Sequence, residues 1–239
     1  MDDIVGRLQS KFSSHQIDVI VGSLLGDARL ECRSVGKRSP ITARFRVHHG
    51  EKQKEYVFWK YEILKDFVSK EPMEISWLNP KRNLQETSWY FHTKSFKELG
   101  SLYHFFYKDK VKILPENIFN LLNPRMIAVW FMDDGSNNGE SLTLNTHGFS
   151  KEDQMRVVNF FKESFDIFPT IVKDRTKWKI AIGKKDFRKF ISIIEPYIIP
   201  AMSYKIANPR NDLSRFAGQS EKLILANTSV PGLENLEKV

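Results

Sequence analysis

The sequence of 239 residues has almost no cysteine and no long apolar segment, and these absences exclude several classes of protein. Its single cysteine, Cys32, rules out a disulfide framework and a zinc site built from thiolates. No stretch approaches the roughly 18 apolar residues of a membrane span, and the N-terminus lacks the apolar core of a secretory signal. We therefore expect a soluble, intracellular protein with no membrane partner, in a bacterial or archaeal cytoplasm or inside an organelle.

Basic residues outnumber acidic ones, with 37 Lys and Arg against 29 Asp and Glu, so the net charge is +8. Residues 207–239 contain four basic and four acidic residues, so the whole excess lies in residues 1–206. A charge excess of this size favours a polyanionic partner. The hydrophobic content of 41% is high enough for a folded core.

Apolar periodicity predicts the same order of elements twice. In the first half we expect an apolar helix over 16–27, strands over 28–34 and 41–48, a helix over 52–69, a hairpin over 73–93 and a helix over 95–107. In the second half we expect an apolar helix from Pro124, a strand over 141–147, a helix over 150–165, a hairpin turning at 174–177 and a helix over 184–198. This pattern indicates an α+β protein with a first half at 1–122, a second half at 123–206 and a tail at 207–239.

Both apolar helices are predicted to end in acidic residues. The first ends VGSLLGDA, with Asp27, and the second ends AVWFMDDG, with Asp133 and Asp134. Free carbonyl groups and partial negative charge gather at a helix C-terminus, so a carboxylate there needs a compensating positive group. Two such ends side by side would offer oxygen ligands to a hard divalent cation. Gly22 and Gly26, four residues apart, would let another helix approach closely enough to align the two ends.

These two segments resemble the two motifs of the LAGLIDADG homing endonucleases, particularly the single-chain, group I intron-encoded subgroup whose second motif reads WFMDDG. The resemblance covers residues 16–206. It implies two pseudo-symmetric αββαββα halves, with the motif helices packed at the centre and antiparallel sheets forming a DNA-binding saddle. The sequence departs from the motifs at Ala28, Val129, Trp130 and Met132, so we expect an asymmetric contact between the two helices.

The resemblance also implies the active-site residues and the cofactor. It assigns the acidic metal ligands to Asp27 and Asp134. It also assigns one catalytic lysine to each half, Lys112 in KILP and Lys205 in IPAMSYK. The main-chain carbonyls of Gly26 and Asp133 would complete the metal sites. Mg²⁺ is the expected cofactor; Mn²⁺ would substitute, and Ca²⁺ would bind without supporting cleavage. The implied reaction is a staggered double-strand break with 3′ overhangs, helped by divalent ions and by lysine charge.

Basic side chains follow the wet faces and turns of the predicted sheets. A two-stranded ribbon fits the major groove of double-stranded DNA, where Arg reads guanine and Asn reads adenine. In the first half the candidate DNA contacts are Arg29, Arg33, Lys37, Arg38, Arg44, Arg46, His48, Lys81 and Arg82. In the second half they are Asn145, Lys173, Arg175, Lys177 and Lys179. We expect the protein to bind as a monomer.

Three other functions fit parts of this pattern. A maturase that binds its own intron RNA would use the same basic surface, and a non-catalytic DNA-binding protein on this fold would tolerate loss of the acids. A nuclease of another class would need a D…ExK pattern, but Asp27 and Glu31 are too close in sequence. His48, His49 and His147 lack HNH-like spacing and are interpreted as surface or groove residues.

Overall fold

The computed structural model describes residues 4–32 and 41–207, so Arg33, Lys37 and Arg38 lie outside the described residues. The chain divides into two compact units, Met1–Ile206 and Ala207–Val239, and the fold below is that of the first. None of its described helices is both long and apolar enough to span a bilayer.

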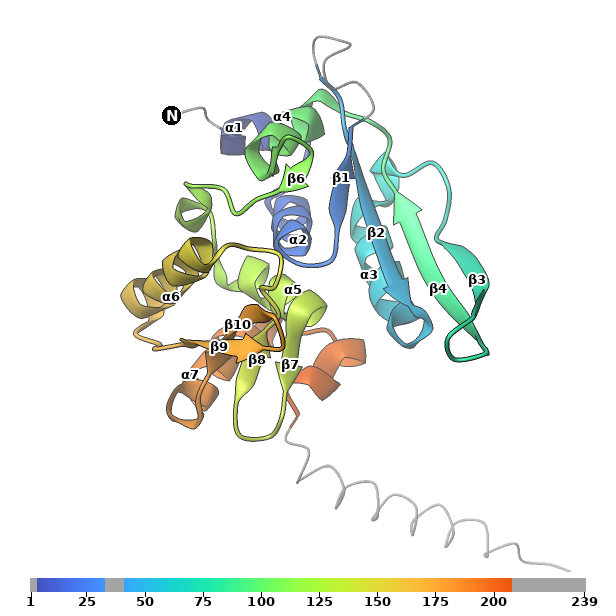
Figure 1. The fold of residues 1–239 in the computed structure, drawn as a ribbon. Helices are drawn as coiled ribbons and strands as arrows, with labels where there is room; N and C mark the ends of the chain where they lie inside the picture. Colours follow the sequence, from blue (N-terminus) through green and yellow to red (C-terminus); the bar gives the residue numbers. More distant parts are fainter. Residues whose placement is uncertain (1–3, 33–40, 208–239) are drawn as a thin grey trace, which may run out of the picture. The chain divides into compact units, whose positions relative to one another are not determined.

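Two successive sets of elements have the same order, as the sequence pattern predicts (Figure 1). The first set is α2 (Ser14–Leu25), β1 (Arg29–Glu31), β2 (Arg44–Gly50), α3 (Lys54–Leu64), β3 (Met73–Asn79), β4 (Leu84–His92) and α4 (Lys97–Phe106). The second set is α5 (Pro124–Asp134), β7 (Gly135–Asn137), β8 (Leu142–Leu144), α6 (Lys151–Phe165), β9 (Thr170–Asp174), β10 (Lys177–Ile182) and α7 (Lys184–Ile194). Each set is therefore an αββαββα unit.

The two antiparallel sheets repeat the same strand order, β1-β2-β4-β3 in the first half and β7-β8-β10-β9 in the second. Helices α3 and α4 pack on one face of the first sheet, and α6 and α7 pack on one face of the second. Among the described residues, no helix of the same half covers the opposite face of either sheet. This common topology supports the duplication that the sequence suggested with little residue identity.

Several elements lie outside the predicted pattern. A short helix α1 (Ile4–Gln9) precedes the first motif helix, and a two-stranded hairpin, β5 (Tyr107–Lys108) with β6 (Val111–Lys112), follows α4. Strand β7 follows α5 directly. Short 3₁₀ turns also occur at Ile118–Asn120 and Pro200–Lys205, while those at Glu51–Gln53, Lys65–Phe67 and Glu195–Tyr197 form the ends of the helices predicted over 52–69 and 184–198. Such short polar or mixed segments carry too few residues for a periodic signal.

Local sequence explains where the two central helices begin and end. Ser13 and Gln16 form a capping box at the start of α2, and the Asn123 side chain accepts a hydrogen bond from the Met126 amide at the start of α5. The prediction that the first helix extends to Asp27 is wrong: α2 ends at Leu25, and Asp27 follows the C-cap residue. Helix α5 does continue to its last acidic residue.

Helices α2 and α5 pack against each other, and equivalent positions of the two motifs meet (Figure 1). A Cβ atom on Gly22 would lie 2.7 Å from Cβ of Val129, and one on Gly26 would lie 2.4 Å from Cβ of Asp133. Glycine on α2 thus makes room for the larger residue at the matching place on α5. This is the asymmetric contact that the bulkier second motif predicts.

Replacing Gly22 by Ala should destabilise the protein, because the added methyl group would also lie 2.6 Å from the main-chain oxygen of Met126. Overpacking of this kind costs about 1–3 kcal/mol, despite alanine's better helix propensity. Urea unfolding measures the effect. The control is Gly148→Ala, where an added Cβ meets no atom within 4 Å. Equal stabilities for the two variants would contradict the close contact.

Candidate active centre

At the C-terminal end of each motif helix, the ammonium group of a lysine donates hydrogen bonds to main-chain carbonyl groups. Lys112 Nζ donates to the main-chain oxygens of Leu24, Gly26 and Ala28 at 2.9, 2.7 and 2.9 Å. These bonds satisfy carbonyls that the end of α2 leaves without partners, and they place positive charge at the negative end of the helix dipole. The sequence analysis predicted that a positive group is needed at this helix end, but only the family resemblance identified Lys112 as that group.

The second half repeats this arrangement. Lys205 Nζ donates to the main-chain oxygen of Asp133 at 2.9 Å and also to that of Met132. Burial lowers the pKa of both lysines, Lys112 and Lys205, while the nearby aspartates oppose this shift. The two lysines implied by the resemblance therefore occupy equivalent positions, one at each helix end.

The two aspartates that follow these carbonyls are destabilised as anions. Burial raises the pKa of Asp134 to about 7, and repulsion from Asp27 and Asp133 adds to this effect, against the attraction of Lys112 and Lys205. The pKa of Asp27 is raised as well, first by burial and then by Asp133. Because Asp27 raises the pKa of Asp134, and Asp133 raises the pKa of both, these acids share one electrostatic site across the two halves.

A buried cation that the sequence analysis did not identify lies beside this site. Lys60 on α3 has a fully buried side chain, and its Nζ donates to Oδ1 of Asp133 at 2.7 Å. Oδ2 of Asp133 in turn accepts from the Asp27 amide at 3.3 Å. An ion pair between elements far apart in the sequence leaves no periodic signal.

The expectation that His49 is a surface or groove residue is wrong. Strand alternation turns it to the core face of β2, where its side chain is 2% exposed and its Nδ1 lies 3.6 Å from Oδ2 of Asp27. Burial lowers the pKa of His49 to about 4, helped by the positive charge of Lys60. Its ring is therefore neutral near pH 7 and faces Asp27 with one nitrogen and Asp133 with the other.

The donor set of this centre fits a hard divalent ion and does not fit zinc. The described part of the chain contains no group of three or more His, Cys, Asp or Glu residues arranged to hold a metal. Mg²⁺ commonly uses one or two protein carboxylates together with water and substrate phosphate, which matches Asp27 and Asp134. The carbonyl oxygens of Gly26 and Asp133 each accept a lysine N–H, and a carbonyl has a second lone pair available.

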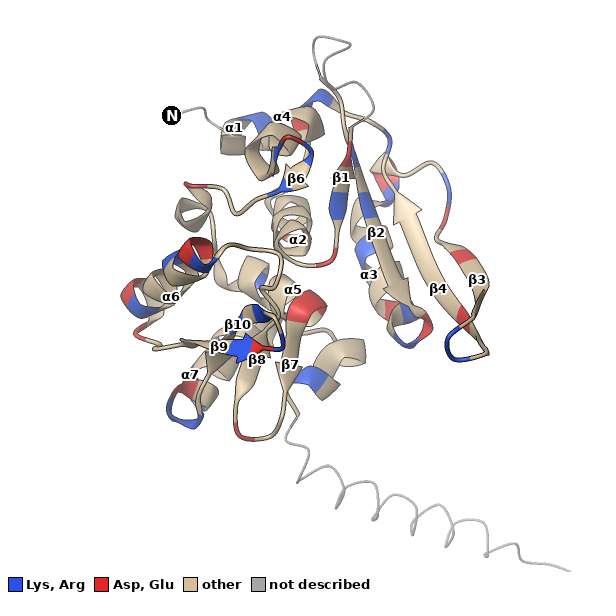
Figure 2. Cartoon of the chain, in the orientation of Figure 1, with Lys and Arg blue, Asp and Glu red and all other residues tan. Residues whose placement is uncertain are grey.

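The uncovered face of the first sheet carries basic side chains, as the sequence pattern predicts, and Figure 2 marks basic positions along β1 and β2. Arg29 pairs with Arg46 and Glu31 with Arg44 in the β1–β2 register, so these four side chains share one face with His48. The carboxylate of Glu31 lies between the arginines, which the sequence analysis did not anticipate. Candidates Lys81 and Arg82 lie in the turn between β3 and β4.

Apolar side chains also lie on this face, although the sequence analysis proposed no contacts from β3. Register places Ile75 opposite Ser88 and Trp77 opposite Glu86, on the same side as Tyr90. Ile75 and Trp77 are 37% and 42% exposed. Exposed apolar groups on an otherwise polar sheet face indicate a surface that contacts another molecule.

The second sheet has the corresponding face on β8, β9 and β10. Lys177, Lys179 and Asp174 lie on it, and Lys179 Nζ is 3.0 Å from Oδ2 of Asp174. Asn145 directly follows β8, and Arg175 lies in the β9–β10 turn with a positive φ. Lys173 pairs in register with Trp178, so strand alternation places it on the other side of the hairpin from Lys177 and Lys179.

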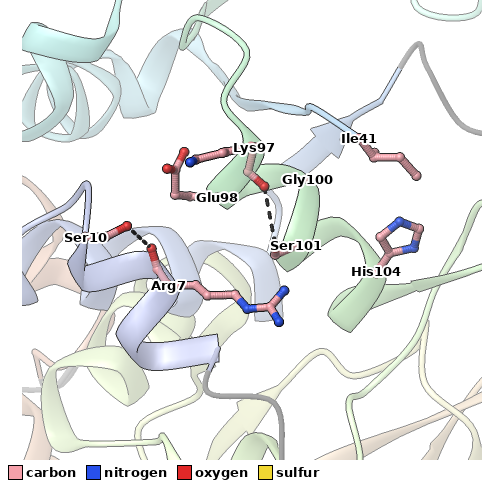
Figure 3. Close-up of a pocket in the computed structure, with 8 residues that line it drawn as sticks. All are labelled: Arg7, Ser10, Ile41, Lys97, Glu98, Gly100, Ser101 and His104. Carbon is pink, nitrogen blue, oxygen red and sulfur yellow. Dashed lines mark hydrogen bonds between the residues drawn. The ribbon is translucent and has the colours of Figure 1, made fainter. Parts of the chain in front are cut away.

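A separate cavity of about 490 Å³ lies between α1 and α4 (Figure 3). Its lining includes the polar side chains of Arg7, Ser10, Lys97, Ser101 and His104. None of the acidic or lysine residues of the motif-helix ends lines it. The cavity is therefore distinct from the cluster of charged residues at the ends of α2 and α5.

The profile of the family described as "LAGLIDADG DNA endonuclease family" matches residues 17–190, which include both motif helices. The chain belongs to this family. Among curated LAGLIDADG relatives, DNA endonuclease I-ChuI of Chlamydomonas applanata is 29% identical over 213 residues, 82% of this chain and 96% of its own length. Cytochrome b mRNA maturase bI2 of Saccharomyces cerevisiae is 28% identical over 220 residues, but only 50% of its length is matched.

Solved structures show the same LAGLIDADG fold. The homing endonuclease I-WcaI bound to its DNA recognition sequence is 24% identical, with a TM-score of 0.74 over 87% of this chain and 93% of that one. I-DmoI in complex with DNA and Ca is 14% identical, with a TM-score of 0.50 over 80% of this chain and 96% of that one. These likenesses confirm the expected α+β fold with two antiparallel sheets.

In this LAGLIDADG protein, Asp134→Asn should stabilise the metal-free state at alkaline pH. The folded-state pKa of about 7 lies above the ordinary value of 3.8, so the native state loses stability as the pH rises from about 4 to about 7. The variant avoids this loss, and its advantage should reach about 1–3 kcal/mol at pH 8. Urea unfolding in EDTA at pH 5 and pH 8 measures it, with the exposed Asp66→Asn as control. A pH-independent difference would contradict the raised pKa.

Replacing Lys60 by Met should destabilise the protein by about 3–5 kcal/mol, because it leaves the carboxylate of Asp133 buried without its partner. The double variant Lys60→Met/Asp133→Asn removes both charges and should recover at least half of that loss. The surface change Lys65→Met is the control. Additive effects of the two substitutions in a double-mutant cycle would show that the ion pair is absent.

Proposed function

We propose that this chain is a site-specific homing endonuclease that acts as a monomer and makes a staggered double-strand break with 3′ overhangs in a long DNA target. The observation that carries the proposal is the pair of lysine-capped helix ends, each presenting one aspartate with a raised pKa. Cleavage would depend on Mg²⁺, with Mn²⁺ able to replace it and Ca²⁺ able to bind without cleavage. The break would promote mobility of a host intron inside a cell or organelle.

The chemistry divides between the bound ions and the side chains of the centre. Bound divalent ions supply an activated water and neutralise charge on the scissile phosphate and the leaving oxygen. Asp27 and Asp134 would hold those ions with the carbonyls of Gly26 and Asp133. Clustered carboxylates with raised pKa values repel each other until a cation is bound, so the free centre favours ion binding. One aspartate per half suits one scissile phosphate per strand.

The lysines would act on the phosphate and on the helix ends together. Lys112 and Lys205 already donate to carbonyls beside the aspartates, so their charge is fixed in place before substrate arrives. A charge positioned in advance can stabilise the transition state without reorganisation. Lys60 and neutral His49 would hold Asp133 and thereby the main chain at Asp27.

The uncovered faces of the two sheets would bind the DNA major groove, as basic β-ribbons can. The proposed contacts in the described residues are Arg29, Arg44, Arg46, His48, Lys81, Arg82, Asn145, Arg175, Lys177 and Lys179. Arg33, Lys37 and Arg38 remain proposed contacts from the segment between β1 and β2, and Lys173 remains one on the side of the second hairpin opposite Lys177 and Lys179. Ile75 and Trp77 would make apolar contacts with thymine methyl groups.

A maturase function is the second candidate, and the likeness to the yeast cytochrome b mRNA maturase favours it. The same cationic faces would then bind intron RNA. The two functions predict different ligands: the nuclease binds and cuts the intronless junction of its host gene, whereas the maturase binds the intron transcript. A non-catalytic DNA-binding protein would bind DNA without cutting it. Such a protein would have no use for two lysine-capped aspartates.

Asp27→Asn and Asp134→Asn should each abolish cleavage, because each removes a charged metal ligand while keeping the size of the side chain. Lys112→Met and Lys205→Met should slow it by about 10²–10³-fold. Each lysine variant should slow one strand more than the other and accumulate nicked DNA. The measurement is strand-resolved cleavage, in Mg²⁺, of a doubly labelled duplex carrying the intronless junction. Asp66→Asn is the control.

Wild-type rates on both strands for either aspartate variant would overturn the assignment of the centre. Wild-type rates for the lysine variants would remove only the lysines from the mechanism. Failure of the unmodified protein to cut the junction in Mg²⁺ or Mn²⁺, together with tight binding of the intron RNA, would favour the maturase.

A further inference from the structure

One carboxylate holds three arginines on the uncovered face of the first sheet. Oε1 of Glu31 accepts from Nε and Nη2 of Arg29 at 3.1 and 2.9 Å, and from Nη1 of Arg46 at 3.3 Å. Oε2 accepts from Nε of Arg44 at 2.7 Å and lies 2.5 Å from its Nη2. Glu31 therefore contacts two nitrogens of Arg29, two of Arg44 and one of Arg46.

The cluster is partly buried and ordered by further contacts. The side chains of Glu31, Arg44 and Arg46 are 20%, 21% and 20% exposed. Nη1 of Arg44 lies 3.2 Å from Nε2 of His92, and the guanidinium of Arg46 lies over the ring of Tyr90 at 4.7 Å. Despite partial burial, which alone would raise it, the pKa of Glu31 falls to about 2 through hydrogen bonds from Arg29 and Arg44. The carboxylate is thus ionised at every relevant pH.

Glu31 occupies the nitrogen pairs that an arginine uses to recognise guanine or phosphate. For Arg29 and Arg44 it contacts both Nε and Nη2, one of the guanidinium edges that can make bidentate hydrogen bonds. A phosphate group on DNA must therefore compete with a carboxylate that is already in place. Long cationic side chains that would otherwise reach phosphates on any sequence are held over the sheet instead.

We propose that Glu31 is a specificity-determining residue of the DNA-binding face, which holds Arg29, Arg44 and Arg46 in a base-reading arrangement and competes with phosphate for them. This inference rests on the proposed DNA-binding function. When the arginines leave or rearrange their contacts with Glu31, DNA of the right sequence replaces those contacts with hydrogen bonds to its bases. DNA of another sequence offers only phosphate. Discrimination by a repulsive element of this kind weakens wrong complexes more than the right one.

The experiment compares Glu31→Gln with Glu86→Gln. Both substitutions remove one negative charge from the same sheet face, but Glu86 lies 3.6 Å from Nη1 of Arg82 and makes no contact with the three-arginine cluster. The probes are a duplex selected by the wild-type protein from a randomised library in Ca²⁺, and a scrambled 30-base-pair duplex. Affinity for each is measured over a range of salt concentrations.

Glu31→Gln should bind the scrambled duplex at least tenfold more tightly than wild type, while its affinity for the selected duplex changes by less. Its ratio of specific to nonspecific affinity should therefore fall. The salt slope on the scrambled duplex should steepen by about 0.9 for each phosphate newly contacted. Glu86→Gln should strengthen both complexes similarly and keep the ratio.

Two results would overturn the inference: an unchanged affinity ratio in Glu31→Gln, or the same change in Glu86→Gln. Failure of the proposed function is distinguishable, because the wild-type protein would then recover no preferred duplex from the library. Circular dichroism and a urea unfolding curve establish that each variant is folded. A folded Glu31→Gln that loses affinity for both duplexes would also contradict the proposal, since it would mean that Glu31 supports binding and does not restrain it.

Discussion

The contact between helices α2 and α5 is the constraint on which the rest of the structure depends. It joins the two halves through equivalent positions of the two motifs, with Gly22 and Gly26 making room for Val129 and Asp133. Because equivalent positions meet, the C-terminal ends of the two helices lie together. The same geometry places Asp27 and Asp134 at these ends. A separation of the helices by one methyl group would disturb both the core and the centre.

Bringing those ends together concentrates negative charge, and the fold compensates for it with three lysines. Lys112 and Lys205 cap the helix ends in the same way in both halves. Lys60 neutralises Asp133 from α3, and the equivalent helix α6 buries no lysine. Asp27 and Asp134 keep raised pKa values even so. The lysines therefore compensate only part of the negative charge, and both carboxylates remain disfavoured as anions.

The sheets apply a similar balance to the opposite sign of charge. Glu31 holds arginines on the first sheet, and on the second Asp174 contacts Lys179 at 3.0 Å and His147 at 3.2 Å. Each face thus carries an acid among its cations. Free basic side chains give affinity for any nucleic acid, whereas side chains fixed by an acid can distinguish one sequence from another.

Much of this architecture follows from sequence, and the parts that do not have a common cause. Period-two and helical patterns predicted most strands and most helices, because each reports burial along one local element. These patterns did not predict the roles of Lys60, His49 and Glu31, because those roles depend on partners in other elements or on neighbouring strands. The end of α2 was misplaced by two residues because Gly26 and Asp27 continue the motif beyond the last helical residue. Lys112 and Lys205 were found through the family resemblance, since an isolated lysine carries no periodic signal.

The central claim is that the α2–α5 contact builds one divalent-cation centre shared by the two halves. Anomalous diffraction from crystals of the protein–DNA complex grown with Mn²⁺ tests it most directly. The account predicts anomalous peaks within coordination distance of the carboxylates of both Asp27 and Asp134, next to the scissile phosphates. Ordered DNA with Mn²⁺ bound elsewhere, and both aspartates contacting only lysine or water, would contradict it.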